Sequence, residues 1–180
     1  DTIFTHFGEH FNELNGKTWG IIGLGAIGRR VADIAKAFGA HVIYYSASGS
    51  APQEGYEQVD FDTLLTTSDI VSVHAPLNEY TKDLMDKEVF AKMKKTAIFL
   101  NLGRGPIVVE QDLCDALESG TIAAAGLDVL CKEPMSASNP LLKIKDSKKL
   151  IITPHIAWAS VEARNRLMQI IVGQIKDFFG

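Results

Sequence analysis

Residues 18–28 read Thr-Trp-Gly-Ile-Ile-Gly-Leu-Gly-Ala-Ile-Gly, and this stretch decides the fold. Its first five residues are mostly apolar and predict a buried strand, whereas residues 26–38 carry apolar side chains at three- and four-residue spacing, which predicts a helix. Between the strand and the helix, Gly23, Gly25 and Gly28 form the pattern G-x-G-x-x-G. This order of strand, glycines and helix is the context in which the pattern binds a dinucleotide.

Each glycine has a physical reason to be where it is. Gly23 permits the tight turn, Gly25 lets the backbone approach a pyrophosphate, and Gly28 allows the helix to pack closely on the strand. The free N–H groups at the start of the helix, around Ala26 and Ile27, would then face the phosphates. The alternative is a glycine-rich turn without a ligand, and the flanking strand and helix favour the dinucleotide.

The rest of the chain alternates between apolar runs and helical patterns. A run that is apolar throughout is typical of a strand buried on both faces, so the sheet is expected to be parallel. The sequence therefore predicts an α/β fold, a Rossmann-type doubly wound parallel sheet of about six strands with helices on both faces. Further strands are predicted at 41–45, 70–73, 97–100, 122–128 and 150–152, helices at 61–67, 86–94, 110–119 and 159–179, and loops at 46–58 and 132–140.

Composition excludes several classes of protein. The 180 residues include 18 Lys and Arg against 22 Asp and Glu, a net charge of −4, so no excess of positive charge exists to neutralise nucleic-acid phosphates. No apolar run approaches the roughly 18 residues that span a bilayer. Cys114 and Cys131 form no CxxC pattern, so no disulfide framework is indicated and a cytoplasmic location is expected.

A zinc-protease pattern occurs near the start of the chain and is set aside. His6-Phe-Gly-Glu-His10 fits H-x-x-E-H, but Gly8 interrupts the helix that this pattern requires. No third ligand is evident, so no metal is predicted.

Polar residues follow the predicted strands at their carboxyl ends, where ligands of such sheets bind. Taken singly, each has an ordinary explanation, such as a solvated loop charge or a structural histidine. Their joint placement along one edge favours a functional site. These residues are Ser46, His74, Arg104, Asp128 and His155, with Glu133 shortly after Asp128.

Several segments together resemble the cofactor-binding domain of the D-isomer-specific 2-hydroxyacid dehydrogenase family. They are residues 23–28, His-Ala-Pro-Leu at 74–77, Asn-Leu-Gly-Arg-Gly at 101–105, Ala-Gly-Leu-Asp-Val at 125–129 with Glu133-Pro134, and Thr-Pro-His at 153–155. Residues 153–160 are further similar to the glycerate dehydrogenase/hydroxypyruvate reductase branch. The resemblance implies an oxidoreductase that transfers a hydride between a nicotinamide cofactor and a small D-2-hydroxy acid or 2-oxo acid.

The same resemblance implies roles for three catalytic residues. Arg104 is expected to bind the substrate carboxylate and polarise its carbonyl, and His155 to donate and accept the proton. Glu133 is expected to hydrogen-bond His155. These residue types suit the chemistry, because a guanidinium binds carboxylates with two hydrogen bonds and a histidine exchanges protons near neutral pH.

The implied cofactor is NAD, but the sequence leaves NADP open. The family commonly has Asp where Ser46 stands, and a serine hydroxyl can bond either a ribose 2′-OH or a 2′-phosphate. Asp128 is expected to face the nicotinamide carboxamide. His74 is expected either to border the adenosine side or simply to pack. The remaining predicted cofactor-binding residues of the matching segments are Pro76, Leu102 and Gly103.

The resemblance also predicts the organisation of the chain. Residues 1–16 are expected to form a linker segment, 17–156 the dinucleotide-binding domain and 157–180 a C-terminal helix, and the family's N-terminal substrate domain is expected to be absent. The chain alone is then expected to bind cofactor with little turnover, and a homodimer is implied. The alternative function is a dinucleotide-sensing interaction module that performs no turnover.

Overall fold

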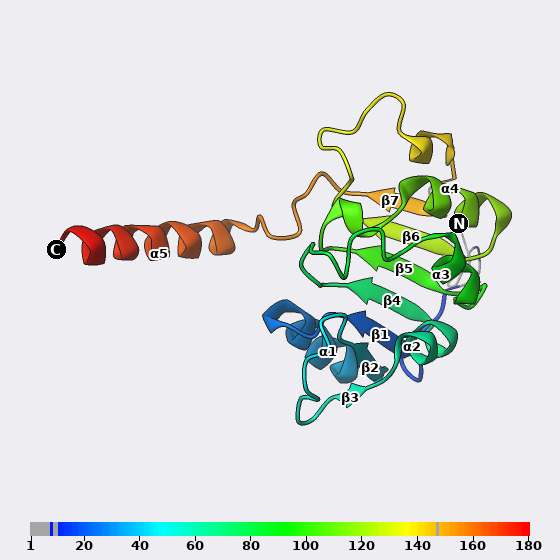
Figure 1. Ribbon diagram of the computed structural model, residues 1–180, viewed down its shortest axis with the longest axis horizontal. Coiled ribbons are helices and arrows are strands. Elements are labelled where there is room, and N and C mark those ends of the chain that lie inside the picture. Colours follow the sequence, from blue (N-terminus) through cyan, green and yellow to red (C-terminus); the bar gives the residue numbers. More distant parts are fainter. Residues whose placement is uncertain (1–7, 9–10, 147) are drawn as a thin grey trace, which may run out of the picture.

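The core of the computed structural model is a seven-stranded parallel sheet in the order β3-β2-β1-β4-β5-β6-β7 (Figure 1). The structure describes residues 8, 11–146 and 148–180. The strands are β1 (Thr18–Ile22), β2 (His41–Tyr45), β3 (Glu57–Gln58), β4 (Ile70–Val73), β5 (Ile98–Asn101), β6 (Ala124–Leu127) and β7 (Leu150–Ile152).

All helices but the last connect successive strands, as the alternating sequence pattern predicts, and the last helix follows the final strand. They are α1 (Ala26–Ala37), α2 (Phe61–Thr67), α3 (Lys87–Lys92), α4 (Glu110–Ser119) and α5 (Val161–Phe179), with short 3₁₀ turns η1 (Gly105–Ile107) and η2 (Pro140–Lys143). The strand order reverses at β1, which lies between β2 and β4. In an open parallel sheet, this reversal marks the crevice where a dinucleotide binds.

The two faces of the sheet carry separate apolar cores, because successive residues of a strand point to opposite sides. In β1, Ile22 belongs to the larger core, which also holds Leu64 of α2, Phe90 of α3 and Leu113 of α4. Its neighbour Ile21 belongs to the smaller core, against α1. Helices α2, α3 and α4 contact one another in sequence, so they form a row on one face and α1 lies on the other.

The fold class predicted from the sequence is confirmed, but the strand count of about six is wrong by one. The additional strand is β3, which lies inside the segment 46–58 that was predicted to be a loop. It has only two residues, both polar, and pairs with β2 alone, through Ile43↔Glu57 and Tyr44↔Gln58. A two-residue polar strand leaves no apolar periodicity from which to predict it.

Some predicted boundaries also move inward. The strand predicted at 122–128 is formed by Ala124–Leu127, the helix predicted at 86–94 by Lys87–Lys92, and the helix predicted at 159–179 by Val161–Phe179. The last two differ because Asp86 and Ser160 act as N-caps, each accepting a hydrogen bond from a backbone N–H of the first turn.

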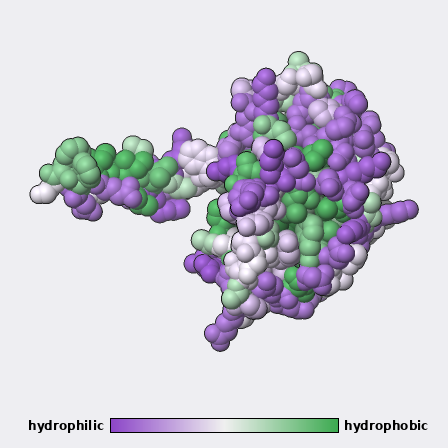
Figure 2. Space-filling view, viewed as in Figure 1, coloured by the Kyte–Doolittle hydropathy of each residue, from purple (hydrophilic) through white to green (hydrophobic). Residues whose placement is uncertain are grey.

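Helix α5 projects from the body of the molecule, at the end of an extended segment that follows β7 (Figure 1). None of its 19 residues is buried. Figure 2 shows hydrophobic side chains along this helix, and they include Leu167, Met168, Ile171, Ile175 and Phe178. Among the described residues, no helix has both the length and the apolar character required to cross a membrane.

The sheet also exposes apolar side chains on the face that α1 shares. Ile98 of β5 is 40% exposed and Ile151 of β7 is 63% exposed.

The predicted division of the chain into 1–16, 17–156 and 157–180 stays a prediction, and within its first segment residues 1–7 and 9–10 lie outside the described residues. The H-x-x-E-H pattern, apart from Gly8, falls there too.

Candidate active site

The glycine-rich loop joins β1 to α1 with the geometry that an anion site needs. Gly23 has φ +92°, a conformation that favours glycine, and a Cβ there would lie 2.7 Å from the backbone of Ala75. No side chain caps the start of α1 at Gly25, and its first turn contains no acidic residue. The N–H groups of Ala26 and Ile27 at this helix start are therefore suited to phosphate oxygens.

The other two glycines of the motif differ in their surroundings. A Cβ at Gly28 would overlap the carbonyl oxygen of Gly23, so the helix can approach the strand only with glycine at this position. A Cβ at Gly25 would meet no atom within 4 Å and would project into open space. The loop thus fits a bound pyrophosphate that passes close to Gly25.

A residue that the sequence did not single out holds this loop. Gln53 donates from Nε2 to the carbonyl oxygen of Leu24 at 3.0 Å, and its Oε1 accepts from Nη1 of Arg29 at 2.9 Å. Gln53 lies in the segment predicted to be a plain loop, and no motif marks it. Only the tertiary structure shows that it joins that segment to the glycine loop.

Ser46 lies directly after β2, where the adenosine ribose is expected. Its Oγ accepts from the backbone N–H of Ser50 at 3.0 Å and lies 3.4 Å from Oγ of Ser48. Because the backbone N–H uses the oxygen as an acceptor, the hydroxyl proton of Ser46 remains able to donate. Ser46 therefore offers a hydroxyl donor where a carboxylate would offer two acceptors.

Arg104 is exposed at the end of the segment that follows β5, and Asn101 shapes that segment. The Asn101 side chain accepts from the N–H of Gly103 at 3.1 Å and donates to the carbonyl oxygen of Arg104 at 3.0 Å. Asn101 is fully buried. At the next residue, a Cβ on Gly105 would overlap the Leu130 backbone, so glycine is required for the Arg104 segment to approach the loop that carries Glu133.

His155 and Glu133 form a hydrogen-bonded pair. Nδ1 of His155 lies 2.8 Å from Oε2 of Glu133, and Oε1 of the same carboxylate accepts from the N–H of Leu130 at 2.9 Å. These two interactions, the Leu130 hydrogen bond first, lower the pKa of Glu133 below its usual value. The pair occupies Nδ1, so Nε2 is the ring atom left to exchange a proton with a substrate.

Asp128 lies just after β6 and is almost fully buried, with 6% of its surface exposed. Burial by itself raises the pKa of a carboxyl group, but hydrogen bonds from Thr153, Ala157 and Ile156 outweigh it, and the pKa of Asp128 is lowered. The group is thus a carboxylate at neutral pH. Its three donors all belong to the segment that carries His155.

His74 follows β4 and is mostly buried, which lowers its pKa to about 4. Its Nε2 lies 3.1 Å from Oγ of Ser72, and Nδ1 has no hydrogen-bond partner among the described residues. Ser72 Oγ also accepts from Nε1 of Trp19 at 2.8 Å. His74 is therefore a neutral ring at physiological pH, consistent with either predicted role, at the cofactor or in packing.

Three cavities along the carboxyl edge of the sheet bring most of the predicted residues together. The first, of about 410 Å³, is lined by Ile27, His74, Pro76, Leu102, Gly103 and Arg104. A second, of about 520 Å³, shares Leu102 with it and also contacts Asp128. A third, of about 590 Å³, shares Asp128 with the second and contacts Glu133 and His155. The shared residues join the three cavities along one edge of the sheet, whereas Ser46 and the three glycines of the motif line none of them.

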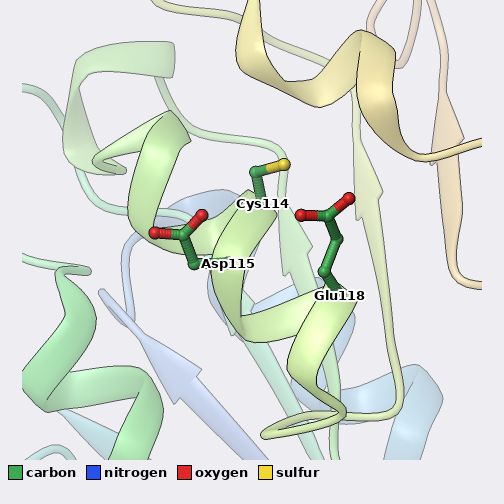
Figure 3. A group of neighbouring side chains, drawn as sticks. All are labelled: Cys114, Asp115 and Glu118. Atoms are coloured by element: carbon green, nitrogen blue, oxygen red, sulfur yellow. The ribbon is translucent and has the colours of Figure 1, made fainter.

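The cysteines do not add a reactive or metal-binding site. Figure 3 shows Cys114, Asp115 and Glu118 together on α4, close enough to suggest a metal site. The thiol of Cys114, however, is buried and donates to the carbonyl oxygen of Pro140, and burial raises its pKa. Burial likewise raises the pKa of Cys131 to about 11, so neither thiol is a ready thiolate at neutral pH.

The fold and the strand-end residues define a class, that of dinucleotide-binding domains of dehydrogenases. Residues 4–157 match the model of the D-isomer specific 2-hydroxyacid dehydrogenase NAD binding domain. The chain belongs to this family, and its resemblance to the family and its nicotinamide cofactor, both inferred from the motifs, are confirmed.

Individual relatives agree with this assignment. The chain is 48% identical over 168 residues to a hydroxypyruvate reductase of Blautia hydrogenotrophica. The aligned region covers 92% of this chain and 51% of the relative. Among solved structures, it resembles D-lactate dehydrogenase from Aquifex aeolicus complexed with NAD and lactic acid, with a TM-score of 0.86, 29% identity, and coverage of 96% of this chain and 57% of that one.

A second solved structure bears on the cofactor. An acyclic imino acid reductase in complex with NADPH and D-Arg matches with a TM-score of 0.84 and 35% identity over 93% of this chain and 52% of that chain. The chain spans about half the length of the relatives it matches.

Proposed function

We propose that this chain is the cofactor-binding part of an enzyme that reduces a small 2-oxo acid, of the hydroxypyruvate or glyoxylate type, to the D-2-hydroxy acid. The observation that carries the proposal is the 2.8 Å contact between His155 and Glu133 at the same sheet edge as Arg104. The His155 side chain is 39% exposed, so a substrate can reach the ring that Glu133 orients.

The chemistry of each catalytic side chain suits a different part of the reaction. The guanidinium of Arg104 binds the substrate carboxylate, and the bound nicotinamide supplies the hydride. Nε2 of His155 gives its proton to the carbonyl oxygen, where negative charge develops during reduction. Glu133 fixes the ring orientation through its contact with Nδ1.

The glycine loop fits the dinucleotide. The uncapped start of α1 presents N–H groups, and the open space at Gly25 leaves room for the pyrophosphate. The predicted contacts of Asp128 with the carboxamide, and of His74 and Pro76 with the adenosine side, belong to this proposal. So do those of Leu102 and Gly103, which line the cavity nearest to α1.

Turnover tests the catalytic assignment and binding tests the cofactor site. In the complete protein that contains this chain, His155→Ala is expected to reduce turnover of 2-oxo acids at neutral pH by about a hundredfold or more. Intact turnover would refute the assignment. This chain alone is titrated with NADH and with NADPH by calorimetry, with fluorescence of Trp19 and Trp158 as a second signal.

The sensing module remains the competing function, and it makes the opposite prediction. Cofactor-dependent capture of a partner, with no turnover of any 2-oxo acid by the complete protein, would support it. The His155–Glu133 pair favours the enzyme, because a sensor has no need of a proton donor.

We also propose that the protein is a cytoplasmic homodimer. Both cysteines are free, as a reducing compartment requires. The exposed apolar stripe of α5 would be covered when two copies associate. Continuous exposed apolar surface is a common mark of such an interface.

A further inference from the structure

The backbone at His155 adopts a conformation that needs support. Its φ is +53°, in the left-handed region that residues with a side chain rarely occupy. The turn is tight, because the N–H of His155 donates to the carbonyl oxygen of Thr153 at 2.9 Å. The position of the His155 ring therefore depends on the contacts that hold this turn in its conformation.

Asp128 supplies three hydrogen-bond acceptor contacts on both sides of His155. Its Oδ1 accepts from Oγ1 of Thr153 at 2.6 Å and from the N–H of Ile156 at 2.9 Å. Its Oδ2 accepts from the N–H of Ala157 at 2.9 Å. The carboxylate therefore closes the turn from residue 153 to residue 157 around the catalytic histidine.

Backbone hydrogen bonds attach Asp128 and Thr153 to the neighbouring strands of the sheet. The N–H of Asp128 donates to the carbonyl oxygen of Asn101 at 3.0 Å, and the N–H of Thr153 donates to that of Leu127 at 2.9 Å. We call the Asp128 carboxylate and its three hydrogen bonds the clamp. Through these backbone hydrogen bonds, the clamp ties residues 153–157 to β5 and β6. The three hydrogen bonds of the Asp128 carboxylate are charge-assisted, and such bonds are among the stronger ones in proteins.

We propose that Asp128 is a positioning residue for His155, acting through the turn that its carboxylate clamps. The clamp sets the left-handed backbone, and this backbone directs Nδ1 to Glu133 and leaves Nε2 toward the substrate. The inference rests on the proposed role of His155 and adds to the expected carboxamide contact. One lone pair of Oδ2 remains for that contact, so the two roles do not compete.

Asp128→Asn tests the clamp in this chain. Asparagine has one acceptor oxygen, so its NH₂ group would face the N–H of Ile156 or Ala157, donor against donor. We expect hydrogen exchange at these two amides to accelerate at least about tenfold. We also expect the ¹⁵N signals of the His155 ring to shift as Nδ1 loses its fixed contact with Glu133. Unchanged exchange and unchanged ring signals would overturn the proposal.

Thr153 provides a matched pair that leaves the charge of Asp128 in place. Thr153→Val removes the 2.6 Å hydrogen bond with little change of shape, and Thr153→Ser retains the hydroxyl. The valine variant is expected to shift the His155 signals in the same direction as Asp128→Asn, by less, and the serine variant to restore them. If valine and serine behave alike, the clamp is not what positions His155. This pair also decides the question should Asp128→Asn fail to fold.

Binding and kinetics separate this inference from the proposed function. In the complete protein, Asp128→Asn is expected to lower kcat while the KM for the 2-oxo acid changes little. Loss of NADH binding with unchanged His155 signals would make Asp128 a cofactor contact only and would refute the positioning role. If the complete protein reduces no 2-oxo acid while the clamp variants shift the His155 signals in this chain, the clamp stands and the proposed function fails.

Discussion

Each carboxylate oxygen of Glu133 has its own partner, the Leu130 N–H for Oε1 and His155 Nδ1 for Oε2. A replacement side chain must therefore offer two acceptor oxygens. Glutamine has one acceptor oxygen, so Glu133→Gln must lose either the Leu130 N–H at 2.9 Å or the His155 contact at 2.8 Å. It also loses the negative charge beside the His155 ring. We expect kcat/KM for 2-oxo acid reduction to fall about 10- to 100-fold at neutral pH.

The pH–rate profile of the complete protein checks this expectation. Glu162→Gln, an exposed glutamate in the first turn of α5, is the control and should leave the profile unchanged. An unchanged Glu133→Gln profile would show that the carboxylate does not support His155 in turnover.

Acid should break the His155–Glu133 pair at a defined point. The pKa of Glu133 is lowered, first by the hydrogen bond from Leu130 and then by that from His155. A carboxyl group with a lowered folded-state pKa contributes stability above its ordinary value of about 4.3 and loses it as the pH falls through the lower value. We expect the pair to persist near pH 4.3 and to separate in more acidic solution. Titration of the Glu133 carboxyl carbon by NMR measures this, and a midpoint above 4.3 would contradict it.

We propose that Ser46 faces the ribose of the bound cofactor. Ser46→Asp places a carboxylate at the end of β2, where it can accept from a ribose 2′-OH and repels a 2′-phosphate. We expect the ratio of NADPH to NADH dissociation constants to rise at least about tenfold, measured by calorimetry on this chain. Ser136→Asp, in the loop after β6, adds the same charge away from β2 and should leave the ratio unchanged. Equal ratios for both variants would mean that Ser46 does not face the ribose.

The glycine loop offers a pair of substitutions whose effects should separate stability from binding. Gly23→Ala puts a Cβ into a left-handed residue and against the Ala75 backbone, so it should cost about 1–3 kcal/mol and lower Tm by several degrees. Gly25→Ala meets no atom within 4 Å, so Tm should be retained while NADH binding weakens at least about tenfold. Thermal unfolding and calorimetry measure the two effects. A Gly25→Ala variant that binds NADH normally would show that no phosphate approaches there.

Local sequence predicts the elements of this fold well where burial is continuous. Strands β1, β2 and β4 are short apolar runs between helical patterns, and the parallel arrangement follows from them. The polar β3 has no such signal, because only its neighbour β2 makes it a strand.

The candidate site divides in the same way. Residues after each strand are predictable because parallel strands end at one edge, so Arg104 and His155 were both placed from the sequence. The clamp of Asp128 on Thr153 was not, since it joins residues 25 positions apart through a side-chain hydrogen bond. Neither was the bridge that Gln53 makes to Leu24, 29 positions away. Contacts of this kind depend on tertiary packing and leave no periodic pattern.

The molecule as a whole exposes a stripe of apolar side chains along its last helix. Helix α5 has no buried residue, and Leu167, Ile171, Ile175 and Phe178 lie on one face of it at helical spacing. Such a stripe on a helix that leaves the body of the protein is expected to be covered by another surface. The proposed homodimer provides that surface, since both copies present the same stripe.

Charge on this stripe tests the homodimer. The double variant Ile171→Glu with Ile175→Glu places two carboxylates one helical turn apart on the apolar face of α5, where association would bury them without partners. We expect the unsubstituted chain to have the mass of a dimer in light scattering and the variant that of a monomer. Gln169→Glu puts one charge on the opposite face of the helix and should leave the dimer intact. A monomeric unsubstituted chain would refute the homodimer for this chain. A variant that stays dimeric would move the interface away from α5, to a surface such as the exposed sheet face at Ile98 and Ile151.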